Sequence, residues 1–522
     1  MSGAQHPYTP TASFDGGDLD CGNGLLLLIR KHIDPLAPGA LLEILSTESS
    51  VVEDLPAWCR LTGNAFVSHI RQGAQHRFLV SKGPLREPVP AAVDSVPAAA
   101  PATLPRLHKE PAPITQPILP VVIPPQLPPP APAPTILPLS VMGIGSWPRP
   151  LWLLRALTDH VEGRMSDDEF TQTADDAVRL VVAAQQRARI DVFTDGEQRR
   201  DNYASFVGGL LDNCQLIPIT DLLPYVDDTD EFARELQALD VPAGKVRHPA
   251  VFGPLGRRHA LAVHEGTFLR QLTSAPVKVA LPGPYLLTRT MWMECIADRA
   301  YATREALAQD IVRVLREEVH FLLAAGVALV QLDEPVLTEV VFGRASQNRT
   351  FMCGALGEKR EPAEELAFAE MLINCVVAGL PRDRLALHVC RGNWTPDESV
   401  ALAGDYRPLV PLLSHVNVGT LFLELCTPRA GEVDVLTDLP QEKRIGVGVV
   451  NQKCASVESF DEVVAKAEQA IAVFGVERVL LTPDCGFATF ADNPIASAVQ
   501  AEQKLAVIKK AAQLLQQRYH IK

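Results

Sequence analysis

The chain has 522 residues, more than one ordinary hydrophobic core accommodates, so we expect two or more domains. Hydrophobic residues make up 47% of it, and the formal net charge of −14 argues against a nucleic-acid-binding protein, which needs clustered Lys and Arg. The chain opens with no basic region followed by an apolar stretch, and no apolar run reaches the roughly 18 residues that span a bilayer, so we expect a cytoplasmic protein that acts on a small molecule and not on a membrane.

Residues 1–84 are expected to form the first domain. Helical patterns in LLLLIRKHIDPL and VVEDLPAWCRLTGN alternate with strand patterns in ALLEILS, NAFVSHIRQ and HRFLVSK. Such alternation over a short length favours a small two-layer α+β fold.

Residues 85–138 are rich in proline and alanine, as in LPRLHKEPAPITQPILPVVIPPQLPPPAPAPTILP. Proline fixes φ and removes an amide donor, so this stretch should be an extended, semi-rigid linker. Alternatively, the aliphatic residues of this stretch could dock on a neighbouring surface.

Residues 139–522 contain recurring apolar strand candidates with helical stretches or long loops between them. The candidates are 139–145, 190–195, 276–283, 327–333, 384–390, 418–424, 444–450 and 478–484. Continuous Val, Ile and Leu runs suit strands buried on both faces, and segments such as TREALAQDIVRVLREEVHFLLAAG have helical periodicity. The pattern predicts an α/β fold, a (β/α)8 TIM barrel, with an irregular excursion over about 200–270 near one barrel mouth.

Polar residues at the carboxyl ends of barrel strands indicate chemistry. His388 and Cys390 close the fifth candidate strand, Glu424 closes the sixth, and Cys485 follows the eighth. Side chains two apart on a strand share a face, so His388 and Cys390 can reach one ion. An imidazole, a carboxylate and two thiolates form a donor set that zinc favours.

The same residues could instead have purely structural roles. A buried Cys commonly acts as a small hydrophobe, and a His on an apolar strand is often a hydrogen-bonded core residue. Cys426 and Cys454 are rival ligands that spacing alone does not separate from the others.

From residue 139 onward the chain resembles the C-terminal catalytic barrel of cobalamin-independent methionine synthase, through GIGSWP, DVFTDGEQRRDN, QLDEP, HVCRGNW, LELCTPRAGE and LLTPDCGF. The resemblance implies zinc ligands at His388, Cys390, Glu424 and Cys485, the same four positions. It also implies a zinc-dependent methyltransferase in which the metal activates the homocysteine thiol to give methionine, with Glu424 as the ligand that could yield when substrate arrives.

The resemblance further implies homocysteine-binding residues, matched by Ile144, Gly145, Ser146, Glu197 and Asp333. The turn would hold the substrate carboxylate, and the two acids would pair with its ammonium. Glu334 could exchange roles with Asp333, and Gly145 could serve only a tight turn.

Several positions depart from the long members of that family. Their second barrel is absent, Lys453 stands where they place a proton-donating histidine, and Thr290 stands at the pterin-stacking tryptophan, with Trp292 two residues on. The methyl donor could therefore be a folate or a corrinoid carrier. The HCRGN sequence is also similar to epoxyalkane:coenzyme M transferases, so alkyl transfer to another thiol is an alternative.

Residues 12–83 resemble TusA/SirA-type sulfur-relay proteins, through SFDGGDLDCGNGLLLLIRK, EDLPAWCRLTGN and FLVSKG. The resemblance implies a persulfide-carrying cysteine at Cys21, activated by a helix N-terminus, and a sulfur-relay partner protein. The family's C-P-x-P is replaced by CGNG here, so a module kept for docking is the alternative. Cys59 is expected to be buried. The alternative function for the whole chain is sulfur handling or docking by the Cys21 module, with the barrel serving as a scaffold.

Overall fold

The computed structural model describes residues 6–17, 19, 25–48, 51–73, 75–85, 117–161, 163–218, 247–292, 300–343, 360–393, 396, 398, 401–431, 433–491 and 493–521. Two compact units are distinguished, and the division within the Pro-rich stretch falls after Ala112. No helix among these residues is both long and apolar enough to cross a membrane.

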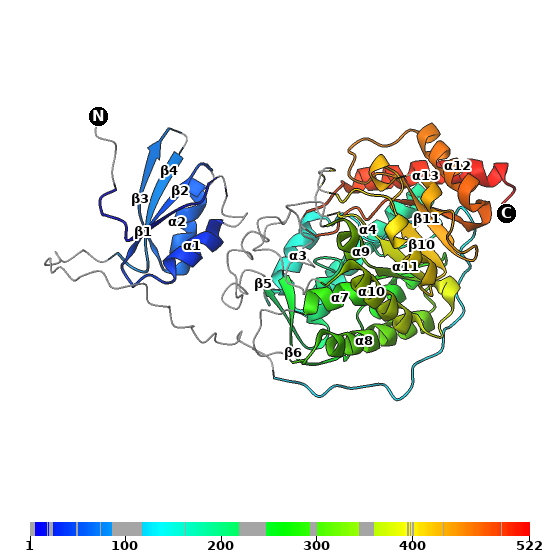
Figure 1. Ribbon diagram of the computed structural model, residues 1–522, viewed down its shortest axis with the longest axis horizontal. Helices are drawn as coiled ribbons and strands as arrows, with labels where there is room; N and C mark the ends of the chain where they lie inside the picture. Colours follow the sequence, from blue (N-terminus) through cyan, green and yellow to red (C-terminus); the bar gives the residue numbers. More distant parts are fainter. Residues whose placement is uncertain are drawn as a thin grey trace. The chain divides into compact units, whose positions relative to one another are not determined.

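The N-terminal unit is a four-stranded sheet with two helices on one face (Figure 1). Its elements are β1 (Ala12–Asp15), α1 (Leu25–Ile33), β2 (Leu41–Ser46), α2 (Val51–Thr62), β3 (Ala65–Gln72) and β4 (Gln75–Ser81). The strand order is β1-β2-β4-β3, with β1 parallel to β2 and the other pairs antiparallel. The two-layer expectation is confirmed, although the sequence patterns gave no sign of β1.

Alternation along the strands builds the core of this unit. Leu42 and Ile44 of β2 and Phe78 and Val80 of β4 belong to one buried cluster with α1 and α2. Cys59 on α2 lies in the same cluster and is 1% exposed, as expected. The hydrophobic faces of sheet and helices thus cover one another.

The larger unit is built on parallel strands. They are β7 (Lys278–Pro282), β8 (Leu329–Asp333), β9 (Leu385–Val389), β10 (Thr420–Leu423), β11 (Arg444–Val450) and β12 (Val479–Pro483). These pair in consecutive order, and every pair is parallel.

Two very short segments close the sheet on itself. Val141 bridges Leu481 of β12, Met142 bridges Val192, and Phe193 bridges Val277 beside β7, all in parallel. The expected (β/α)8 TIM barrel is therefore present, but its first two strands are reduced to bridges.

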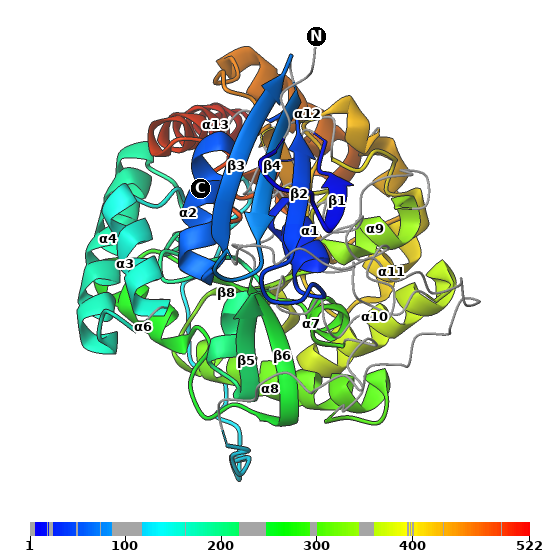
Figure 2. The same cartoon turned by 90° about the vertical axis from the view of Figure 1, so that its left-hand side faces the viewer.

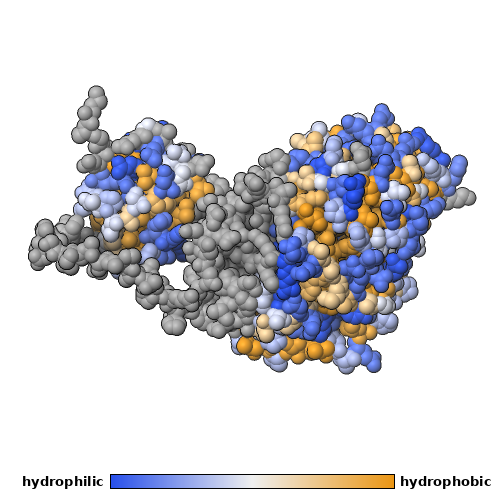
Figure 3. Space-filling model, in the orientation of Figure 1, coloured by the Kyte–Doolittle hydropathy of each residue, from blue (hydrophilic) through white to orange (hydrophobic). Residues whose placement is uncertain are grey.

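Helices of the larger unit lie around the rim of the view in Figure 2. They are α3 (Leu151–Val161), α4 (Asp167–Ala188), α6 (Val263–Leu272), α7 (Pro284–Met291), α8 (Arg304–Ala324), α9 (Val336–Phe342), α10 (Pro362–Val377), α11 (Val410–His415), α12 (Phe460–Phe474) and α13 (Ala498–Arg518). Serine caps begin several of them, and Ser459 and Ser497 each complete a capping box with the residue three positions on. Figure 3 shows hydrophilic and hydrophobic residues interspersed on the visible face of the barrel.

The excursion over about 200–270 is more regular than expected. It contains the 3-10 helix η1 (Ser205–Gly209) and the strands β5 (Asp212–Pro218) and β6 (Arg247–Gly256), which form a two-stranded sheet, before α6 begins. Residues 219–246 lie outside the described part of the chain.

Residues 117–138, in the Pro-rich stretch, run extended against the barrel. The amide of Ala131 donates to Leu323 at 3.0 Å, and the Asn213 side chain bonds both the amide and the carbonyl of Leu119. Ile136 is 8% exposed and joins a buried cluster that includes Leu329, Ala386 and Phe422 of the barrel strands. Ile136 therefore packs into the barrel, whereas Ile118, Val122, Ile123 and Leu137 of the same segment are exposed.

Candidate functional site

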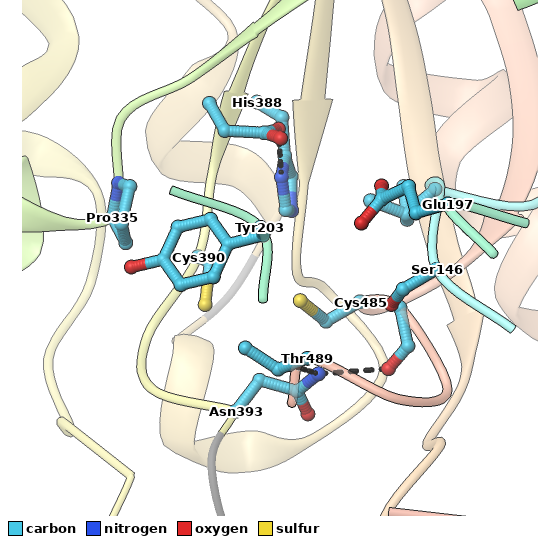
Figure 4. A pocket seen from close by; sticks show the side chains of 12 residues that line it. Ser146, Glu197, Tyr203, Pro335, His388, Cys390, Asn393, Cys485 and Thr489 are labelled. Carbon is cyan, nitrogen blue, oxygen red and sulfur yellow. Dashed lines mark hydrogen bonds and ion pairs between the residues drawn. The ribbon is translucent and has the colours of Figure 1, made fainter. Parts of the chain in front are cut away.

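Residues at the carboxyl ends of the strands line one pocket. Its walls include Ile144, Ser146, Glu197, Asp333, His388 and Cys390. Cys485 also lines it, and Figure 4 shows the His388 ring and the sulfurs of Cys390 and Cys485 directed toward one space. Most of the expected metal and substrate residues therefore share a single cavity.

Three of the four expected metal ligands form a compact donor group. A sulfur from Cys390, a carboxylate oxygen from Glu424 and a sulfur from Cys485 all lie within 4.8 Å of one another, and all three residues are buried. They follow β9, β10 and β12, so barrel closure brings together segments that are far apart in sequence.

His388 lies outside that compact group but lines the same pocket. Its Nδ1 is 2.9 Å from Asp333 Oδ1, and its Nε2 is buried without a hydrogen-bond partner among the described residues. A carboxylate on one ring nitrogen and a free second nitrogen form the usual arrangement of a metal-binding histidine. His388 Nε2 is thus available as a fourth metal ligand.

The backbone after β9 shapes the Cys390 end of the group. The Gly392 amide donates to Cys390 Sγ at 3.2 Å, and Gly392 has φ of 107°, which side chains disfavour. The glycine of the HVCRGNW motif therefore allows a backbone donor to face the ligand sulfur.

The rival ligands make other contacts. Cys426 Sγ is 2.8 Å from Lys466 Nζ, and the exposed Cys454 has its sulfur 3.1 Å from Ser456 Oγ. Neither belongs to the compact donor group found among the described residues.

The donor group is a cluster of buried acidic side chains, and a bound cation would balance their charge. A hydrogen bond with Cys390, together with burial and the charge of Glu424, raises the pKa of Cys485 well above its usual range. Glu424 accepts from the Arg391 amide at 2.8 Å and from Arg429 at 3.3 Å, so its carboxylate is held in place. Buried thiols and a carboxylate this close can all ionise only when a positive ion joins them. The donor set fits a divalent, sulfur-preferring metal.

A second half of the pocket is built around Glu197. A Cβ at Gly145 would collide with Glu197 Oε1, so glycine is required for the close approach of the carboxylate to the turn. Glu197 Oε2 is buried and has no hydrogen-bond partner in the described residues. Burial raises the pKa of Glu197 to about 7, although the charge of Arg200 acts against the shift. This carboxylate could receive a cationic group of a ligand.

The neighbouring acids Asp333 and Glu334 have different roles. Asp333 lines the pocket and accepts from Gln331 Nε2 at 2.7 Å as well as from His388. The two oxygens of Glu334 accept, at 2.8 Å each, from the amides of Tyr285 and Leu286 in the first turn of α7. Glu334 therefore serves as a helix cap, and Asp333 faces the ligand space.

Other pocket residues were not selected from the sequence. Tyr203 and Pro335 line the cavity, as do Asn393 and Thr489, whose side chains are 2.8 Å apart (Figure 4). Tyr203 directly follows the motif DVFTDGEQRRDN, Pro335 ends QLDEP, and Asn393 lies within HVCRGNW. Their place in or beside these motifs could have identified them from the sequence.

The positions that depart from the long enzymes are buried. Lys453 is 8% exposed, and burial lowers its pKa while the charges of Cys390 and Glu424 act in the opposite direction. Thr290 and Trp292, at the end of α7, are 6% and 5% exposed. Cys21 lies outside the described residues.

Comparisons with known proteins agree with this geometry. Residues 139–508 match the family model described as cobalamin-independent synthase, catalytic domain, and residues 24–82 match the model described as sulfurtransferase TusA. The methionine synthase of Saccharolobus solfataricus is 24% identical over 352 residues, 67% of this chain and 88% of that protein. The methionine synthase of Sulfolobus acidocaldarius is 27% identical over 353 residues, 67% of this chain and 86% of that protein.

A solved structure has the same barrel fold. The B12-independent methionine synthase from Shewanella sp. W3-18-1, in complex with selenomethionine, superposes with a TM-score of 0.55 at 23% identity, covering 74% of this chain and 99% of that one. A putative vitamin-B12-independent methionine synthase from Listeria monocytogenes gives a TM-score of 0.53 at 18% identity, covering 73% and 99%.

A divalent cation should stabilise the barrel. After treatment with a chelator, adding zinc at about 1,000 times its dissociation constant should raise the free energy of unfolding by about 4 kcal/mol, because the cation binds only the folded donor group. Thermal or urea unfolding measures this change. The double variant Cys390→Ser, Cys485→Ser should lose the effect, whereas Cys375→Ser, at an exposed cysteine, should keep it. Equal stabilisation of all three proteins would contradict the proposed donor group.

Proposed function

Because this chain belongs to the cobalamin-independent methionine synthase family, we propose that its barrel transfers a methyl group to the thiol of homocysteine and so forms methionine. Two buried atoms in the pocket support this function most directly, His388 Nε2 and Glu197 Oε2. Neither has a hydrogen-bond partner among the residues that the structure describes. One suits a metal and the other an ammonium, and homocysteine carries both a thiol for the metal and an ammonium.

The metal that fits these residues is zinc. His388, Cys390, Glu424 and Cys485 would hold it, a set with two thiolates and one imidazole that matches zinc preferences. When bound, zinc would lower the pKa of an incoming thiol and keep its sulfur nucleophilic. A reducing compartment such as the cytoplasm would keep the ligand thiols free of disulfides.

The amino-acid part of the substrate would bind beside this centre. The turn Ile144, Gly145 and Ser146 would receive the carboxylate, and Glu197 would pair with the ammonium. Since Glu197 and Cys485 line one pocket, a substrate held at both ends would have its sulfur fixed in position. The chain's own contribution is thus orientation of the thiol and exclusion of water.

Arg429 would stabilise Glu424 throughout the reaction. Its guanidinium lies 3.3 Å from Glu424 Oε2 and 2.8 Å from Glu398. The Glu424 carboxylate can therefore weaken its hold on a cation without becoming an unpaired buried charge.

The methyl donor is proposed to be a folate or a corrinoid carrier. Alkyl transfer to a different thiol, as in the coenzyme M transferases, is the enzymatic alternative. Lys453 stands where the resemblance implies a proton-donating histidine, and we propose that this buried residue meets the donor's leaving group.

Product analysis tests the function. The zinc-loaded protein should convert homocysteine to methionine when supplied with methyl-folate or with methylcobalamin, as measured by mass spectrometry. Cys390→Ser should lower the rate more than about a hundredfold, since even groups that only support metal ligands cost 10- to 100-fold when lost. Cys375→Ser is the control, since Cys375 is exposed and does not belong to the donor group. No methionine from either donor, together with turnover of another thiol, would favour the alternative.

The role of Glu197 predicts a pH dependence. The pKa of Glu197 is about 7, so the carboxyl is mostly neutral at pH 6 and mostly charged at pH 8. Methionine, which has the ammonium but no thiol, should therefore bind the metal-loaded protein about tenfold more weakly at pH 6 than at pH 8 in calorimetry. Glu197→Gln should bind weakly at both pH values. Glu317→Gln, at a buried acid paired with Arg313, should keep the pH dependence, and its loss there would contradict the assignment.

For the N-terminal unit, which matches the TusA model over residues 24–82, we propose sulfur carriage by Cys21, three residues before the matched range. A helix N-terminus lowers a thiol pKa and makes the thiol reactive. Brief treatment with polysulfide should add sulfur to the peptide that contains Cys21 in preference to the exposed Cys375 and Cys454, as read by peptide mass spectrometry. Equal labelling of the three cysteines would leave docking as the function of this unit.

A further inference from the structure

Lys278, on β7, is a buried cation inside the barrel. It is 1% exposed, and its ammonium lies 4.4 Å from the centre of the Phe422 ring. Burial lowers its pKa to about 7, while the charges of Asp333, Glu197 and Cys485 act in the opposite direction. Burying an ammonium is costly unless its donors are used, so its contacts are informative.

The ammonium makes two short hydrogen bonds. Nζ donates to the carbonyl oxygen of Ile144 at 2.7 Å and to Gln331 Oε1 at 2.6 Å. Gln331 Nε2 in turn donates to Asp333 Oδ1 at 2.7 Å, and the same oxygen accepts from His388 Nδ1 at 2.9 Å. One continuous chain of hydrogen bonds therefore runs from the turn at Ile144 to the ring of His388.

We propose that Lys278 is a positioning residue that aligns the amino-acid-binding turn and the metal-ligand His388 through Gln331 and Asp333. It does not touch the reacting atoms. This role rests on the proposed function for both ligands, the metal at His388 and the amino acid at the turn.

The direction of each hydrogen bond explains the role. Because Lys278 has donors only, it fixes the oxygen of the Gln331 amide toward itself and leaves the NH₂ group for Asp333. Asp333, as an acceptor, then holds the proton on His388 Nδ1 and leaves the lone pair on Nε2 for a metal. Without the ammonium, the Gln331 oxygen loses its donor, so the amide is held less firmly, and the Asp333 carboxylate is less firmly positioned against His388.

The second bond acts on the other half of the pocket. The Ile144 carbonyl immediately precedes Gly145, which is in contact with Glu197. The same ammonium therefore fixes the position of the turn that would receive the substrate carboxylate. A single cation thereby sets the relative position of the two ends of the substrate.

The barrel offers a matched control in Lys443. It is fully buried, and its Nζ donates to the carbonyl oxygens of Val416 at 2.6 Å and Val418 at 3.1 Å. These carbonyls precede β10, so they lie at the opposite end of that strand from Glu424. Lys278→Met and Lys443→Met each remove one buried ammonium, but only the first breaks the chain to His388.

The experiment measures binding without turnover. Zinc affinity is determined by competition with a chelating dye, and methionine affinity of the zinc-loaded protein by calorimetry. Lys278→Met should weaken zinc binding about 10- to 100-fold, as loss of support for a ligand histidine does, and should also weaken methionine binding. Lys443→Met should leave both affinities within about twofold, which is the reproducibility expected of a site left intact.

A second variant separates the two bonds. Gln331→Leu breaks the link to Asp333 but keeps the Lys278 bond to Ile144, so zinc affinity should fall and methionine affinity should change little. The visible spectrum of the cobalt(II)-loaded variant should change as the His388 ligand is perturbed.

Unchanged zinc affinity in Lys278→Met, or in Gln331→Leu where Lys278→Met fails to fold, would overturn the proposal. Failure of the proposed function is a different result: the wild-type protein would bind zinc and yet neither bind methionine nor form it.

Discussion

The constraint on which the site depends is the burial of negative charge at the carboxyl end of a closed parallel barrel. Cys390, Glu424 and Cys485 approach within 4.8 Å of one another away from solvent, and such a group can be fully ionised only with a cation among them. The positive groups around it are arranged accordingly. Arg429 balances Glu424 from the side, and Lys278 lies in the barrel interior beneath the pocket. Charge balance, more than packing, accounts for which side chains surround this end of the barrel.

Barrel closure is what turns separate sequence positions into one site. Each parallel strand brings its carboxyl end to the same rim, so residues that follow β9, β10 and β12 meet although they are far apart in the chain. Closure here depends on bridges at Val141, Met142 and Phe193 where full strands were expected. The chain leaves the sheet early at these two points and proceeds directly into the segments that carry Gly145 and Glu197. Ile144, Ser146 and Glu197 of these segments line the pocket.

The sequence was sufficient for the features set by local periodicity. Apolar runs located the barrel strands, and the two-residue spacing of His388 and Cys390 predicted that both side chains face one space, the pocket that they line. It was insufficient where contacts depend on distant segments. Asp333 and Glu334 are consecutive, and only the position of the α7 N-terminus decides that Glu334 is a cap. Tyr203 reaches the pocket from the long excursion, whose path no periodicity specifies.

The distribution of free and engaged carboxylates bears on which thiol the pocket suits. Asp333 Oδ1 is already used by Gln331 and His388, whereas Glu197 Oε2 has no partner in the described part of the chain. A thiol that carries an ammonium at the right distance would satisfy Glu197 while its sulfur reaches the metal donors. Coenzyme M carries a sulfonate and no ammonium, so it would leave the Glu197 carboxylate without a cationic partner. The electrostatics of Glu197 therefore favour an amino-acid thiol over an anionic one, independently of any sequence resemblance.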